Sequence, residues 1–417
     1  MQSSNIIGFQ FNVLISFLLS PLGILSLLLV PVAVIVLLSS SAARWTALAL
    51  LLWLSTFGVV VELPWFKSVL MFPLEDLRKL AKSLCIILML LMIPAAMFSA
   101  TTGRTKHPIA ASWAYFFFLL VITLRIMSAG YLDRAATQFL TVALTFLIFG
   151  IGVPRWIQNV DDIRRALKCI TWAGLLLVVC TLMQVVVDSK QVILVGRLYG
   201  VTGNPQFLGS VMGLCLTPAL CLLLESRESK LWRLTLAGTI GFMIVCMVWA
   251  GSRTGVLGAG LNILLFFRLR LGKIFVGAII VALSLWVALQ FFSESFAGAD
   301  RLFSTTDTRS EAWSSMYDSF LRNPVLGSVG EGFGYQENTY LAVASQFGIV
   351  GILPGLLVIV LAINTIRKLL LVRSRLGTSA VMCDVVFSGL VALAVICMFD
   401  AYPLAIVGFH VFFLYIY

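Results

Sequence analysis

Long apolar runs separated by short polar segments recur from the beginning of the chain to its end. A run of about 20 apolar residues can cross the ~30 Å hydrocarbon core of a bilayer as a helix. Only helices and closed barrels pair all their backbone groups in lipid, and these runs lack the alternating polarity of barrel strands. The pattern therefore predicts an all-α, polytopic membrane protein.

Apolar runs of about this length predict roughly twelve spans. They lie near 12–38, 45–63, 83–99, 109–127, 137–153, 169–187, 207–224, 232–250, 254–267, 274–292, 339–365 and 380–399, and a short apolar tail follows at 404–417. Pro21 and Pro31 predict that the first span is kinked or interfacial. No polar stretch is long enough for a soluble domain, so residues 1–417 are expected to form a single membrane-embedded domain.

The distribution of charge predicts the orientation of the second half of the chain. Basic clusters lie at 268–273 and 367–375, and between them the 293–337 segment carries seven acidic residues and three arginines. Basic residues near span ends remain in the cytoplasm, which predicts that the clusters face inward and that 293–337 is a large external loop. Basic residues at 78–82 conflict with this alternation, so the orientation of the first 130 residues stays open.

The net charge of +11 does not call for a nucleic-acid partner, because most of the excess lies in predicted cytoplasmic loops beside anionic lipid head groups. All eight cysteines lie in or beside apolar runs without metal-ligand spacing, which is typical of small buried hydrophobic residues. His107 and His410 are far apart in the sequence and have no companion ligands nearby. We therefore expect neither a metal site nor a cofactor.

Two arginines lie in predicted external turns. Arg197 opens the segment Arg197–Gly209, whose Gly-Asn-Pro turn precedes a span. It either snorkels from a helix end or binds a ligand. Arg253 lies in Gly251–Gly255, near a predicted helix N-terminus, where the dipole favours anions and glycines allow close approach of the backbone. The positive-inside distribution does not explain an external arginine there, which favours a functional role.

An amphipathic helix is predicted at 308–321 within the external loop. Arg309, Trp313 and Tyr317 follow one another at intervals of four residues, which places them on one side of that helix. The two aromatic rings could stack on sugar faces. They could equally belong to the belt of Trp and Tyr residues found at membrane interfaces.

One carboxylate stands directly before a predicted span. Glu337 begins the sequence Glu-Asn-Thr-Tyr-Leu, and an acid at a membrane boundary is costly without a partner or a role. It is either a general base for a hydroxyl group or a helix N-terminal acid stabilised by the dipole. Asp400, at another predicted external end, is interpreted as a simple loop acid.

External arginines, one carboxylate and no metal-ligand cluster predict a reaction with a diphosphate leaving group. Arginine presents planar, bidentate donors that suit phosphate oxygens, and guanidinium groups can neutralise a departing pyrophosphate. The carboxylate can deprotonate an acceptor hydroxyl. An external membrane site without ATP then indicates a polyprenyl-diphosphate-linked sugar as donor.

The order and spacing of these motifs resemble the O-antigen ligase and O-antigen polymerase superfamily. The resemblance covers roughly residues 190–360, and the first half of the chain agrees only in hydropathy. It is carried by R-x-x-G-x-x-x-N-P, S-R-T-G, R-x-x-x-W, N-P-x-x-G-x-x-G-x-G-F, and N-x-Y-L with F-G-I-V-G, at Arg197–Pro205, Ser252–Gly255, Arg309–Trp313, Asn323–Phe333 and Asn338–Gly351.

The resemblance implies a GT-C-like helical fold in the bacterial inner membrane, with a large periplasmic loop over the active site. It also implies metal-independent, inverting transfer of a glycan from undecaprenyl diphosphate. Arginines hold the donor diphosphate in this family, and they map onto Arg197, Arg253 and Arg309. The ligase branch carries a histidine where this chain has Glu337, which favours a polymerase over a ligase that joins the glycan to lipid A-core.

Two functions of other classes are alternatives to a glycan transferase. A transporter or flippase for lipid-linked sugars would be expected to show internal repeats and ionisable groups near the bilayer midplane, and neither is evident here. A polysaccharide-binding scaffold without activity is a third reading. A chain-length regulator is among the expected protein partners of a polymerase.

Overall fold

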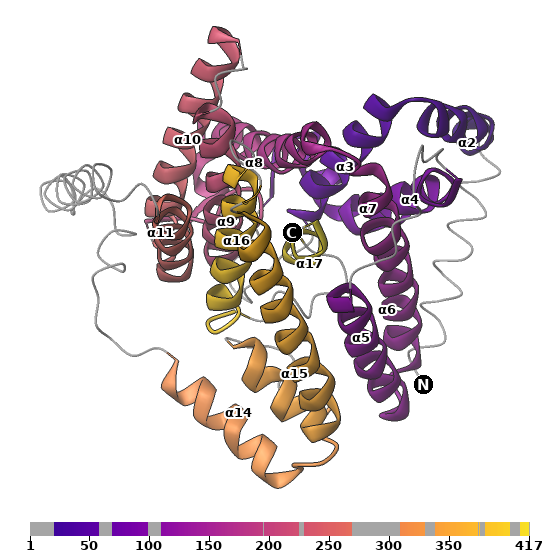
Figure 1. The fold of residues 1–417 in the computed structure, drawn as a ribbon, viewed down its shortest axis with the longest axis vertical. Coiled ribbons are helices and arrows are strands. Elements are labelled where there is room, and N and C mark those ends of the chain that lie inside the picture. The colour runs from indigo at the N-terminus through magenta and orange to yellow at the C-terminus, as the bar shows by residue number, and fades with distance from the viewer. Residues whose placement is uncertain are drawn as a thin grey trace, which may run out of the picture.

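A computed structural model describes residues 21–57, 69–98, 110–194, 196–224, 229–268, 309–329, 338–373, 375, 380–400 and 409–416. The predicted span at 274–292, most of the 293–337 segment and Glu337 itself lie outside these residues. The described part is almost entirely helical (Figure 1). Its two strands, β1 (Ile193–Leu194) and β2 (Arg197–Leu198), form a short antiparallel hairpin in which Ile193 is opposite Leu198.

The helices follow the apolar runs of the sequence. They are α2 (Pro21–Ser39), α3 (Ser41–Ser55), α4 (Leu74–Phe98), α5 (Ala110–Ser128), α6 (Leu132–Thr145), η1 (Phe146–Gly152), α7 (Val153–Trp156), α8 (Val160–Asp188), η2 (Ser189–Gln191), α9 (Pro205–Leu224), α10 (Lys230–Trp249), α11 (Arg253–Phe267), α14 (Ser310–Arg322), α15 (Thr339–Arg373), α16 (Ala380–Ile396) and α17 (Phe409–Ile416).

Seven helices in the described part are long and apolar enough to cross a membrane, or up to eight if a bent pair counts as one span. This confirms an all-α, multi-pass membrane protein. Two further apolar helices, α11 and α16, are shorter. The total of about twelve spans stays a prediction, since part of it rests on residues outside the described ranges.

The N-terminal apolar region is broken. Val30–Ser39 and Ser41–Ser55 meet at an angle of 115°. The bend falls at Ser40, whose side chain accepts a hydrogen bond from the Ala43 backbone N–H and so begins α3 as a new helix. Pro31 lies inside α2 rather than at the bend. A break is therefore present in this region, but a helix cap marks it and not a proline.

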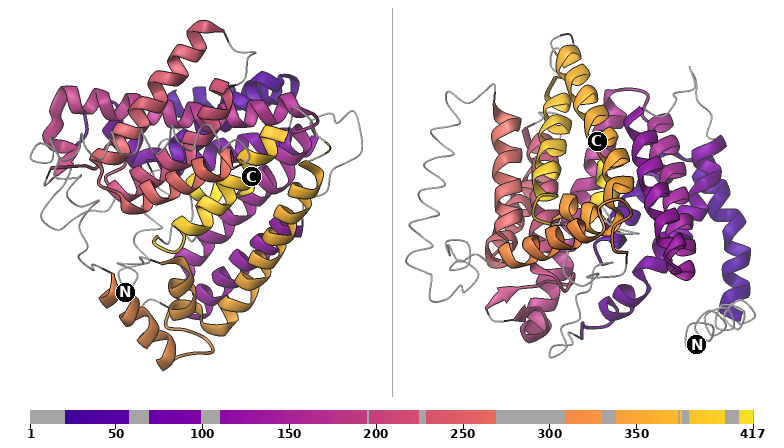
Figure 2. Two further views of the ribbon diagram at one scale, coloured as in Figure 1. Left: turned by 60° about the vertical axis from the view of Figure 1, so that its left-hand side comes forward. Right: turned by 90° about the horizontal axis from the view of Figure 1, so that it is seen from below.

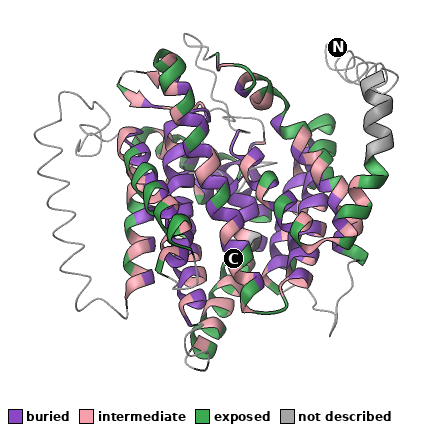
Figure 3. Cartoon of the chain, turned by 90° about the horizontal axis from the view of Figure 1, so that it is seen from above, coloured by how far each residue is buried: buried purple, intermediate pink, exposed green. Residues whose placement is uncertain are grey.

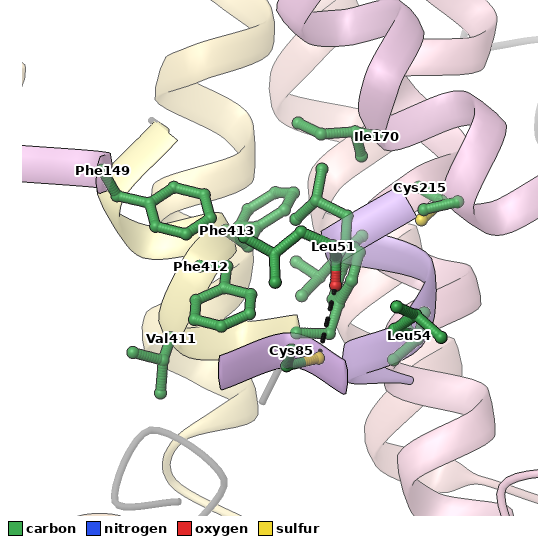
Figure 4. Packing of buried hydrophobic residues seen from close by; sticks show 14 of the residues in the cluster. Leu51, Leu54, Cys85, Phe149, Ile170, Cys215, Val411, Phe412 and Phe413 are labelled. Carbon is green, nitrogen blue, oxygen red and sulfur yellow. Dashed lines mark hydrogen bonds between the residues drawn. The ribbon is translucent and has the colours of Figure 1, made fainter. Parts of the chain in front are cut away.

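The centre of the bundle is formed by α9, in which 83% of the membrane-length window is buried, against 11% for α15 at the periphery. Buried residues gather in the middle of the molecule and exposed ones on its outer faces (Figure 3). The C-terminal helix α17 lies within the core, where the Phe149 and Phe412 rings stack with centroids 4.6 Å apart (Figure 4). The described part of the tail predicted at 404–417 is thus a core element, and all eight cysteines are buried as expected.

Small residues bring α9 and α11 close together. A Cβ atom on Gly209 would collide with Ser252, and one on Gly255 would collide with the backbone of Gly209. Close approach of this kind through small residues is a common way for helices to associate in membranes. Its consequence here is that the N-terminus of α11 is held against the start of α9.

The predicted helix at 339–365 is not one straight span. Gly348 has φ 58° and ψ −155°, so that α15 consists of a short segment before this residue and a long segment after it. Only glycine adopts such a conformation without strain. The long segment reaches Arg373 at the opposite end of the bundle.

That opposite end is held by a partly buried ion-pair cluster. Arg373 donates from Nε and Nη2 to the two carboxylate oxygens of Asp384 at 2.7 and 2.8 Å, and Arg268 donates to the same carboxylate at 2.8 Å. The two arginines come from the two predicted cytoplasmic clusters, and the structure brings them to one end. The side of the membrane that this end faces stays a prediction.

Candidate functional site: an arginine cluster at one turn

The candidate site is centred on the turn between α10 and α11. Ala250 follows the last residue of α10, and Gly251 takes φ 59°. Ser252 then caps α11, because its hydroxyl accepts a hydrogen bond from the Gly255 backbone N–H at 3.1 Å. The chain therefore reverses sharply and presents Arg253 as the first residue of a helix.

Arg197 reaches this turn from the β1–β2 hairpin. Gly196, with φ 70°, forms the tight turn before it. The Nε atom of Arg197 donates to the Ala250 carbonyl oxygen at 3.0 Å, and the residue is half-buried. The side chain is thus directed into the protein at the end of α10, rather than extended along the bilayer surface.

Arg309 reaches the other side of the same turn. It directly precedes α14, and its Nη2 atom donates to the Thr254 hydroxyl at 3.2 Å. Its guanidinium carbon lies 5.2 Å from the centre of the Phe399 ring, which is the geometry of a cation–π contact. Thr254 and Phe399 together hold this guanidinium next to the first turn of α11.

All three arginines predicted to bind a diphosphate are therefore gathered at residues 250–254. Arg253 belongs to the turn, while Arg197 and Arg309 hydrogen-bond to its two ends. The positive end of the α11 dipole adds to their charge at this place. Such an arrangement of bidentate donors suits an anion with several oxygen atoms, such as a phosphate or diphosphate.

The structure separates the two aromatic residues predicted to bind sugar. Trp313 is half-buried and packs against Phe399, with ring centroids 6.3 Å apart, so it lies beside the arginine cluster. Tyr317, four residues further along α14, is 53% exposed. Trp313 remains placed to contact a bound sugar near the arginines, whereas Tyr317 does not share its surroundings.

Glu337 lies outside the described residues, but the structure describes the residues that directly follow it. Asn338 caps α15 by accepting hydrogen bonds from the backbone N–H groups of Tyr340 and Leu341. Thr339 donates its backbone N–H to the Cys397 carbonyl at 2.8 Å and its hydroxyl to the Asp400 carbonyl at 2.6 Å. The start of α15 is therefore attached to residues 397–400, the turn whose Phe399 contacts Arg309.

Asp400 is buried, in contrast to its interpretation as a simple loop acid. Its exposed fraction is 3%, and it lies in the same turn as Phe399, at the junction of α15 and α16. The position of this acid in a strongly apolar C-terminal region is the feature of the sequence that indicates burial. Thr254 and Phe399 gave no signal, because nothing in a sequence distinguishes a threonine or phenylalanine that touches an arginine.

A turn at residues 323–328 anchors the other end of α14. The kink at Gly348 leaves backbone N–H groups of α15 without helical partners, and Pro324 and Val325 supply carbonyl acceptors to Ile349 and Val350 at 2.8 and 3.2 Å. Ser328 donates its backbone N–H to the Ser345 carbonyl at 2.8 Å. The motifs N-P-x-x-G and F-G-I-V-G therefore form one structural unit.

An arginine from the first half of the chain also supports this turn. Arg125, in the last turn of α5, donates from Nε to the Leu326 carbonyl at 2.8 Å. It also donates from Nη2 to the Gly327 carbonyl at 3.5 Å. No pattern in the sequence indicates this role for Arg125, because its partner carbonyls lie about two hundred residues away.

The described residues contain no group of three or more His, Cys, Asp or Glu side chains arranged to hold a metal ion. His410 is buried in the core, where its Nε2 atom is 2.9 Å from the Ser210 hydroxyl oxygen. No protein-family model and no curated protein matches this sequence. The family resemblance therefore stays a prediction.

Proposed function

We propose that this protein is a glycosyltransferase that uses a glycan linked to undecaprenyl diphosphate as donor. It transfers the glycan to a sugar hydroxyl at the periplasmic face of the bacterial inner membrane, as a polymerase of O-antigen type. The observation that carries the proposal is the meeting of Arg197, Arg253 and Arg309 at one turn. These arginines come from three separate motifs of the sequence.

The arginines act on the leaving group. In a single inverting displacement, the bond between the sugar C1 and the diphosphate oxygen breaks while the acceptor oxygen bonds to C1. Negative charge then grows on the diphosphate, which departs as undecaprenyl diphosphate. Fixed guanidinium donors and the N-terminus of α11 stabilise that charge without reorganising during the reaction.

Glu337 accepts the proton of the acceptor hydroxyl in this proposal. Its neighbours Asn338 and Thr339 belong to the junction with residues 397–400, and Phe399 of that junction contacts Arg309. Trp313, which packs on the same Phe399, is available for stacking on a sugar ring. A base and a diphosphate clamp drawn from adjoining elements are what such a transfer requires.

Glu337 also favours polymerase over ligase, because the ligase branch that this chain resembles carries histidine at that position. A polymerase would extend one glycan chain with another, and a chain-length regulator would be a fitting partner. A ligase would instead deliver the glycan to lipid A-core. The acceptor that supports turnover distinguishes the two reactions.

The experiment is a transfer assay with purified protein in lipid nanodiscs and a lipid-linked oligosaccharide donor. Arg197→Lys and Arg253→Lys keep the positive charge but lose the bidentate fork, and each should lower turnover by roughly tenfold to a thousandfold if a transition-state donor is lost. Arg322→Lys, on the exposed side of α14, is the matched control and should retain near wild-type turnover. Near-normal glycan products from both substitutions at the turn would overturn the assignment.

A further inference from the structure

Helix α14 lies across one end of the helix bundle, which we call the arginine end because Arg253 lies there. The start of α14 meets α11 and the turn after α16 through the contacts of Arg309 with Thr254 and Phe399. Its far end meets α15 and α5 through the 323–328 turn. Figure 2 shows α14 beside α15 at this end of the molecule in two further views.

The surface of α14 is divided into three parts. One side packs on the protein and includes Trp313 and Met316. A second side is polar and exposed, with Glu311, Asp318 and Arg322. Between them runs a third, apolar and exposed part, and it continues into the turn that follows. We call it the apolar strip, and it consists of Tyr317, Leu321, Val325 and Leu326, with exposed fractions of 52–58%.

The apolar strip is continuous with the membrane-facing surface of the bundle. Val325 accepts a hydrogen bond from Val350, and the neighbouring Ile349 and Leu353 of α15 are exposed apolar residues. Leu326 accepts one from Arg125, next to exposed Leu124 of α5. Large apolar side chains exposed on membrane-spanning helices face lipid. The strip therefore extends a lipid-facing surface onto a helix that does not span.

The length of α15 places the strip at the edge of the hydrocarbon layer. The long segment begins after Gly348, and its first basic residues are Arg367 and Lys368. Residues 349–366 rise roughly 27 Å at about 1.5 Å per residue, close to the ~30 Å of the hydrocarbon core. Since the 323–328 turn binds the kink itself, its apolar side chains lie at the boundary between lipid and water.

From this geometry we propose that α14 is an interfacial helix, whose apolar strip inserts into the leaflet at the arginine end. The partner of this surface is the lipid bilayer, in the zone between head groups and acyl chains. A helix with an apolar side and a polar side binds there by burying the apolar side, and tyrosine is favoured at that depth. The bilayer then supports the helix that carries Arg309 to the α10–α11 turn.

The test measures the depth of single labels in full-length protein reconstituted into phosphatidylcholine vesicles. Leu321→Cys lies on the strip, and Ser315→Cys lies on the exposed polar side of the same helix, about 120° away around its axis. Each is labelled with a bimane maleimide and exposed to lipid carrying a doxyl quencher near the head group, or to aqueous iodide. Unsubstituted protein serves as the blank, because all eight native cysteines are buried.

We expect doxyl lipid to quench the label at 321 roughly twofold more than the label at 315, and aqueous iodide to quench the label at 315 more than the label at 321. Equal quenching of the two labels by doxyl lipid would overturn the proposal. So would a label at 321 that is shielded from both quenchers while Leu321→Cys forms a disulfide-linked dimer, since a second copy of the chain would then cover the strip. Neither readout depends on transferase activity, so the result tests this proposal independently of the proposed function.

Discussion

The Nη2 atom of Arg309 donates a hydrogen bond to the hydroxyl oxygen of Thr254 at 3.2 Å. The two residues are 55 positions apart in the sequence. Thr254 follows Arg253 in the first turn of α11, so this contact brings an arginine from the predicted external loop to an arginine at the start of an apolar helix. It connects two motifs that are separate in the sequence and makes them parts of one positively charged site.

Removal of the Thr254 hydroxyl should weaken the placement of Arg309. Thr254→Val keeps the shape of the side chain but cannot accept the hydrogen bond, and bonds to charged groups are worth about 1.5–3 kcal/mol. We expect turnover of lipid-linked donor to fall by roughly tenfold to a hundredfold. The measurement is the steady-state rate with purified protein in nanodiscs.

Thr254→Ser is the matched variant, because it restores the hydroxyl and should recover most of the rate. If valine and serine variants had equal rates, the contact would have no part in the reaction. A fall in thermal stability that parallels the loss of rate would assign the bond to folding instead.

Glu337→Gln tests the proposed base. Glutamine keeps the size of the side chain but cannot accept a proton, and turnover should fall by roughly 10²–10⁴-fold, while binding of the lipid-linked donor stays near normal. Glu337→His should keep part of the activity, since a neutral imidazole accepts a proton near pH 7, with the acid limb of the pH–rate profile moving towards ~6.5.

The matched control for this experiment is Glu311→Gln on the exposed side of α14, which should leave the rate unchanged. An unchanged rate and pH–rate profile for Glu337→Gln would leave Glu337 as a helix N-terminal acid and would assign the base elsewhere.

Gly348→Ala should disrupt the support of α14. A Cβ atom there would overlap the carbonyl groups of Pro324 and Val325, and the φ of 58° is unfavourable for alanine. We expect a loss of about 1–3 kcal/mol in stability, together with faster proteolysis in the 309–329 region. Thermal unfolding in detergent and limited proteolysis measure the two effects.

Gly355→Ala provides the comparison on the same helix, because its Cβ would meet only an ordinary contact with Phe118 at 3.4 Å. Alanine at 355 should be tolerated and should slightly favour the helix. Equal stability of the two variants would show that the 323–328 turn does not depend on the conformation at Gly348.

Orientation can be tested by labelling intact cells with a membrane-impermeant maleimide. Ser304→Cys, in the predicted external loop, should react, and Ser374→Cys, in the predicted cytoplasmic segment, should react only after the membrane is opened. The native cysteines contribute little background because they are buried. Labelling of the cysteine at 374 but not of the one at 304 would invert the topology and contradict a periplasmic site.

The sequence by itself determined the class of fold. In lipid each backbone donor and acceptor must be paired within its own helix, so a long apolar run can take only one structure. For this reason the spans near 83–99, 109–127, 169–187 and 232–250 correspond to α4, α5, α8 and α10. The candidate arginines were also found from the sequence, since an arginine in an external turn departs from the usual distribution of charge. The role of Glu337 as general base stays a prediction from the sequence.

Only the tertiary structure decided which of these residues meet. Arg197 contacts Ala250, and Arg309 contacts Thr254 and Phe399, across separations that no local pattern encodes. The same packing directs Trp313 towards the arginines, leaves Tyr317 exposed and buries Asp400. The physical reason is that the hydropathy of a segment decides only whether that segment forms a membrane helix. The meeting of side chains depends instead on how close two helices can approach, which the glycines of α9 and α11 and the kink at Gly348 decide here.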